Sequence, residues 1–127
     1  MSNITEKEYS ACYEHGKLVF EGKESEIEAV RFLSNPTGVG MNKNSAKYYV
    51  TAYLKMRCGG LYKKTINNDA TGYYLTRIYA ENGKDGLRIA LIALKRHLDF
   101  YSKQGKGDLV LLQNIYDCFI EEIVNKE

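Results

Sequence analysis

Apolar side chains recur every three or four residues along almost the whole chain of 127 residues. The longest stripe of this kind runs over 85–101, and shorter ones lie in 5–21 and 43–58. This spacing aligns apolar residues on one face of a helix. The best strand candidate, "KLVFEG" at 17–22, fits the first helix equally well. The sequence therefore predicts an all-α fold, a compact bundle of about five to six helices.

Capping residues divide this pattern into separate helices. "TEKE" at 5–8 and "SEIE" at 25–28 are capping boxes, in which side chain and backbone cap each other at a helix start. Asn42 is an N-cap before the next helix, Asn82-Gly83 ends a later one, and Asp108 begins the last.

The chain is expected to be a single helical domain over 1–127, with a helix-turn-helix at 25–58. Gly is mostly isolated and Pro36 is the only proline, which argues against long linkers.

Composition indicates a soluble protein of the cytoplasm. The chain is 44% hydrophobic and 27% charged, and it contains neither an apolar run long enough to span a membrane nor an apolar signal core. We therefore expect no membrane partner. The three cysteines form no Cys-x-x-Cys pair, so they are expected to be reduced and to lie in or near the core.

Charge is distributed unevenly, although the formal net charge is only +2. Residues 1–28 hold three basic and seven acidic residues, whereas residues 29–68 hold seven basic residues and no acid. A basic block between acidic and near-neutral flanks is typical of a surface that binds a polyanion. Its members are Arg31, Lys43, Lys47, Lys55, Arg57, Lys63 and Lys64.

The stretch "TGVGMNKNSAKYYV" at 37–50 could be a phosphate loop or the turn of a DNA-binding motif. A Walker loop requires Gly-x-x-x-x-Gly-Lys-Ser/Thr, and Gly38 and Gly40 lack that register. A dinucleotide fingerprint requires a preceding strand and a third glycine, where this chain has Lys43. A capped helix, a glycine turn and a second helix instead outline a helix-turn-helix.

In that motif the second helix enters the major groove, and its N-terminal residues meet base edges. Asn pairs with adenine, Lys reaches guanine or phosphate, and free N–H groups after Asn42 favour a phosphate. The connector after this helix is expected to clamp the DNA backbone. The predicted contacts on the helix are Asn42, Lys43, Asn44, Lys47, Tyr48, Thr51 and Lys55, and those on the connector are Tyr62, Lys63, Lys64 and Thr65.

No constellation in the sequence indicates catalysis. His15 and His97 are not at a metal-ligand spacing, and the basic block contains no carboxylate or histidine that could hold an ion at a scissile phosphate. His97 lies on an apolar stripe, which favours a hydrogen-bonded core residue, although a pocket with Tyr101 is an alternative. We therefore predict a non-enzyme without metal or cofactor.

Three segments resemble a helical domain found in front of the catalytic module of bacterial HNH endonucleases, often labelled 5-methylcytosine-specific restriction enzymes. They are the pattern Gly-Met-Asn-x-x-Ser-Ala at 40–46, the "YKKT" connector at 62–65 and the segment 97–101. The resemblance covers about residues 20–120. It implies recognition of DNA, plain or modified, in defence against foreign DNA.

By this resemblance, Asn42, Ser45 and Ala46 shape the reading helix, and Ser45 is a further predicted DNA contact. The connector grips the strand, and His97 and Tyr101 lie beneath or beside the surface. The HNH module with its histidines has no counterpart here, so nuclease activity is not carried over. The chain is then an excised domain or a free-standing relative, with a nuclease domain or a partner protein as its partner.

Two further functions remain open. Eleven tyrosines without any tryptophan would also suit a helical protein-interaction module, such as an adaptor or an inhibitor of a defence complex, since Tyr is enriched at interfaces. A small enzyme with a site built from His97, Tyr101 and the Tyr73-Tyr74 pair is the third alternative. Our first hypothesis is a non-catalytic DNA-binding domain that acts on double-stranded DNA.

Overall fold

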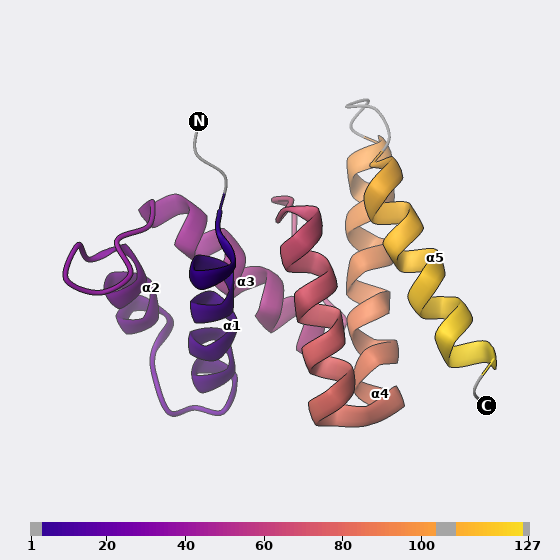
Figure 1. Cartoon of the computed structure of the whole chain (residues 1–127), viewed down its shortest axis with the longest axis horizontal. Coiled ribbons are helices and arrows are strands. Elements are labelled where there is room, and N and C mark those ends of the chain that lie inside the picture. Colours follow the sequence, from indigo (N-terminus) through magenta and orange to yellow (C-terminus); the bar gives the residue numbers. More distant parts are fainter. Residues whose placement is uncertain (1–3, 104–108, 126–127) are drawn as a thin grey trace. The chain divides into compact units, whose positions relative to one another are not determined.

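The computed structural model describes residues 4–103 and 109–125, and within these ranges the chain forms helices and no strand. The predicted all-α fold is confirmed. The predicted cap Asp108 lies outside the described residues. The helices are α1 (Glu6–Phe20), α2 (Glu26–Ser34), α3 (Lys43–Cys58), α4 (Asn68–Lys103) and α5 (Val110–Asn125) (Figure 1).

The chain divides into two compact units, Met1–Leu54 and Lys55–Glu127, and the division falls within α3. The expectation of one domain over 1–127 stays a prediction.

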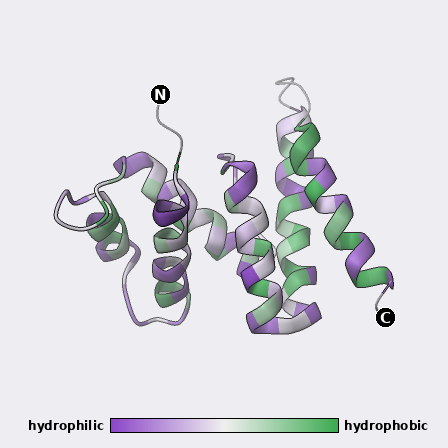
Figure 2. Cartoon of the chain, in the orientation of Figure 1, coloured by the Kyte–Doolittle hydropathy of each residue, from purple (hydrophilic) through white to green (hydrophobic). Residues whose placement is uncertain are grey.

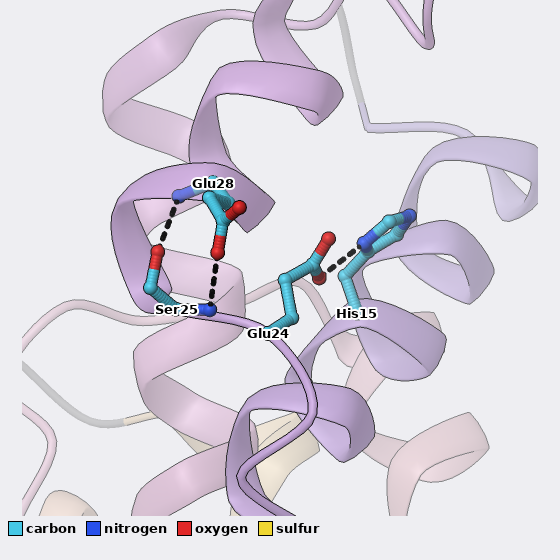
Figure 3. Close-up of polar contacts among 4 residues, drawn as sticks. All are labelled: His15, Glu24, Ser25 and Glu28. Carbon is cyan, nitrogen blue, oxygen red and sulfur yellow. Dashed lines mark hydrogen bonds and ion pairs between the residues drawn. The ribbon is translucent and has the colours of Figure 1, made fainter.

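Both predicted capping boxes are present in the first unit. At the start of α2, the Glu28 backbone N–H donates to Ser25 Oγ at 3.0 Å, and the Ser25 backbone N–H donates to a Glu28 carboxylate oxygen at 3.0 Å (Figure 3). The hydrogen bond from the Ser25 backbone N–H, and after it one from the Ser25 side chain, lower the pKa of the Glu28 carboxyl. Just before the cap, Glu24 contacts His15 Nδ1 of α1 at 2.7 Å (Figure 3). Helix starts in this unit are therefore set by local sequence.

Aromatic and sulfur side chains fill the core of the first unit. Tyr13 of α1 meets Tyr53 of α3 edge to face, with ring centroids 4.8 Å apart. The buried Cys12 thiol donates to the Met41 sulfur at 3.4 Å. Burial raises the pKa of Cys12 to about 12, so the thiol stays protonated and unreactive.

All three cysteines are free thiols, as predicted, but only Cys12 lies in the core, because Cys58 and Cys118 are exposed. Both lie on amphipathic helices, where a small side chain fits either face. The spacing of the cysteines in the sequence does not show which of them are buried and which are exposed.

In the second unit, α4 consists of two arms that fold back on each other at Gly83 (Figure 1). Gly83 has φ +71° and ψ −167°, a conformation open essentially to glycine alone. The break lies where the sequence predicts it. The second arm packs against α5, and hydrophobic residues run along that arm in Figure 2. The buried side chains of this unit include Leu75, Ile78, Leu87, Leu91, Leu94 and Leu112.

Replacing Gly83 with alanine is expected to lower the free energy of unfolding by about 2 kcal/mol, because the left-handed backbone is strained for any residue with a Cβ. No heavy atom lies within 4 Å of the added Cβ, so the cost arises from the backbone alone. Urea titration followed by circular dichroism measures it. An alanine variant as stable as the parent would mean that α4 does not fold back at this residue.

Candidate nucleic-acid interface

The turn between α2 and α3 is held by Asn35 and requires a glycine at position 38. The Asn35 side chain accepts hydrogen bonds from the Thr37 backbone N–H at 2.9 Å and from the Thr37 hydroxyl at 2.8 Å. The Gly38 N–H donates to the Asn35 carbonyl at 2.8 Å. A Cβ on Gly38 would collide with the carbonyl oxygen of Phe32. Gly38 therefore permits a close approach of two backbone segments, and no bound phosphate is needed to explain a glycine at this position.

Asn42 caps α3 as predicted. Its side-chain oxygen accepts hydrogen bonds from the backbone N–H groups of Asn44 at 2.9 Å and Ser45 at 3.1 Å. These donors are therefore engaged within the protein, which corrects the expectation that they are free for a phosphate. An anion at this end of α3 would be bound chiefly by side chains.

The first half of α3 has one exposed polar face and one buried face. Lys43, Asn44 and Lys47 are exposed, and no acidic residue lies in the first turn. Among the described residues, neither lysine forms an ion pair, so both charges are available to a ligand. Of the other predicted contacts on α3, Asn42 is exposed, while Ser45, Tyr48, Thr51 and Lys55 are partly buried.

The opposite side of α3 is buried, as the apolar stripe at 43–58 predicts. Ala46, Val50 and Tyr53 have no exposed surface. Ala52 and Met56, on the neighbouring side of the helix, are also fully buried. Because α3 is buried over more than one stripe, its polar surface is confined to a narrow strip near its start.

The basic connector in the second unit exposes Lys63, Lys64 and Thr65, as predicted. The prediction that Tyr62 contacts DNA is wrong, because its side chain is only 2% exposed and cannot grip a strand. Its ring stacks on the His97 imidazole, with centroids 4.5 Å apart and planes 5° from parallel. The Lys63 ammonium lies 5.6 Å from the centre of the Phe100 ring, within reach of a cation–π contact.

His97 is fully buried and holds the connector by both ring nitrogens. Nδ1 lies 2.7 Å from the Tyr62 carbonyl oxygen, and Nε2 lies 2.8 Å from the Thr65 hydroxyl. A carbonyl only accepts, so Nδ1 carries the proton and Nε2 accepts from Thr65. Burial lowers the pKa of His97 below 6.5, although the bond to Tyr62 opposes this shift.

His97 is therefore the hydrogen-bonded core histidine that the sequence favours over a pocket residue. Tyr101, the second residue of the proposed pocket, is partly buried with its ring centroid 6.1 Å from the imidazole. Among the described residues, the buried Tyr62 hydroxyl has no hydrogen-bond partner, and burial raises its pKa.

A groove that sequence reasoning did not anticipate lies on the first unit, where α2 meets the start of α3. Its volume is about 400 Å³. Residues from both helices line it. Two of its three cations, Lys43 and Lys47, were predicted DNA contacts, and the third, Arg31, was not. The spacing within α2 gives no sign of this groove, because it forms only when the two helices pack. Its lining residues are Glu26, Ile27, Val30, Arg31, Ser34, Lys43 and Lys47.

Within residues 4–103 and 109–125, no group of three or more His, Cys, Asp or Glu side chains is placed to hold a metal ion. Over the same residues, no helix combines the length and the apolar character needed to cross a membrane.

Comparisons with protein-family models, curated proteins and solved structures found no match for this chain.

Proposed function

We propose that this chain is a non-catalytic DNA-binding domain. The observation that carries the proposal is the acid-free, exposed face at the start of α3, which follows a tight turn and an Asn cap. Lys43, Asn44 and Lys47 on this face combine charge for phosphates with an amide that suits adenine. In the second unit, the exposed Lys63 and Lys64 on an anchored connector supply further charge for a DNA backbone.

The resemblance to domains of HNH endonucleases extends this proposal to plain or modified double-stranded DNA in a restriction or defence system of the cytoplasm. A nuclease domain or a partner protein would then supply any cleavage. An acidic protein is the alternative partner for the same basic surfaces, and the binding experiment separates the two.

Binding to a short labelled duplex is expected to weaken steeply with salt, with a log–log slope of about −0.9 for each phosphate neutralised. Changing Lys47, Lys63 and Lys64 together to glutamine should flatten this slope by up to about 2.7. Fluorescence polarisation at about 50 to 200 mM salt, with plain and methylated duplexes, measures both quantities.

The matched control changes Lys7, Lys23 and Lys103 to glutamine. These residues are exposed, lie outside the 29–68 block and carry the same total charge. If the control loses as much affinity as the test variant, net charge and not a defined surface governs binding. If no duplex binds at low salt while a protein partner co-purifies, the interaction-module alternative replaces the proposal.

A further inference from the structure

The groove between α2 and the start of α3 combines two kinds of surface. Ile27 is 71% exposed, and the edge of Val30, which is otherwise buried, lines the groove beside it on the same helix. Arg31, Lys43 and Lys47 add three cations from two helices to the same lining. The groove thus offers an apolar strip and a cluster of positive charge.

The three cations outnumber the acid in the groove lining. All are exposed, and none forms an ion pair among the described residues. Arg31 lowers the pKa of Glu28 only as the smallest of the causes acting on that carboxyl. Glu26 is the one acid in the lining. The groove therefore keeps a net positive charge.

A nucleic-acid strand matches this combination, because anionic phosphates alternate with largely apolar sugars along its backbone. A single free phosphate would leave the apolar strip uncovered. We propose, as a refinement that rests on the DNA-binding function above, that this groove binds the sugar-phosphate backbone of one DNA strand. Arg31, Lys43 and Lys47 contact its phosphates, and the exposed side chain of Ile27 contacts its deoxyriboses.

This assignment changes the roles expected of the residues at the start of α3. Lys43 and Lys47 become phosphate ligands, which position the protein without reading sequence. Asn44 is exposed and does not line the groove, so it is the residue left to meet a base edge. Arg31 of α2 becomes a new contact residue.

The test is Arg31→Gln in the full chain, measured by fluorescence polarisation against several duplexes of different sequence. We expect the salt slope to become shallower by about 0.9 and the affinity to fall by the same factor for every sequence. Ile27→Ser should weaken binding at an unchanged salt slope, because it removes an apolar contact and no charge. Asn44→Ala should reduce discrimination between sequences and leave the slope unchanged.

Lys7→Gln, on the exposed surface of α1, is the matched control for loss of one charge from the same unit. Thermal unfolding confirms that each variant is folded. If the parent protein binds DNA and Arg31→Gln leaves its slope and affinity unchanged, the groove assignment is wrong while the proposed function stands. The assignment is also wrong if Arg31→Gln alters affinity for one sequence only. If the parent binds no duplex but binds a poly-glutamate peptide, both proposals fall.

Discussion

Replacing Gly38 with alanine is expected to lower the free energy of unfolding by about 3 kcal/mol, at the upper end of the range for overpacking. The added Cβ would meet the carbonyl oxygen of Phe32, which belongs to the backbone and cannot rotate away as a side chain could. The turn between α2 and α3 would have to open, and the groove that these helices line would change with it. Urea titration measures the stability, and DNA titration measures the consequence for the groove.

The control is Gly72→Ala, on an open surface of α4, where no heavy atom lies within 4 Å of the added Cβ. Alanine should stabilise that helix by about 0.5–1 kcal/mol, because it restricts the unfolded chain and favours the helix. The two substitutions are chemically identical and are expected to act in opposite directions. Equal effects would show that Gly38 is not in the close contact described.

Replacing His97 with alanine is expected to lower the free energy of unfolding by about 3 kcal/mol. The change removes the partner of the Tyr62 carbonyl, and it leaves a void beneath the Tyr62 ring. His15→Ala is the control, because His15 is partly exposed, whereas His97 is fully buried. A His97 variant that unfolds no more easily than the His15 variant would contradict the anchoring role.

The stability of the protein should also depend on pH through His97. Because burial lowers its pKa in the folded state, the unfolded chain binds the proton more readily. Neutral His97 therefore makes its full contribution to the free energy of unfolding above about pH 6.5. This contribution is lost as the pH falls from there through the lower pKa of the folded state. His97→Gln removes this titration, so its unfolding free energy should fall less between pH 7 and pH 5 than that of the parent. Parallel curves would rule out a buried neutral imidazole.

The helices and their limits were predictable because local residues determine them. The capping boxes at Thr5 and Ser25, the Asn42 cap and the Gly83 break each act within a few residues. The buried position of Tyr62 was not predictable, because the connector has no periodic pattern and its partner His97 is 35 residues away. A tyrosine among lysines reads as a surface residue until that partner is known.

The candidate site was predictable only where it coincides with a helix face. The exposed positions of Lys43, Asn44 and Lys47 follow from the apolar stripe on the other side of α3. The sequence assigns Arg31 to the basic block, but its position in a groove could not be inferred, since a groove depends on how two helices pack. Likewise, a sequence marks Asn42 as a cap but does not show which N–H groups its side chain occupies.

The anchoring of the connector by His97 bears on the entropy of any binding event at Lys63 and Lys64. The imidazole bonds to Tyr62 on one side of this lysine pair and to Thr65 on the other. Ordering a flexible backbone costs about 1–2 kcal/mol per residue, and here that cost is met when the protein folds. An anion that reaches these lysines would mainly have to restrict their side chains, so the connector is preorganised for contact.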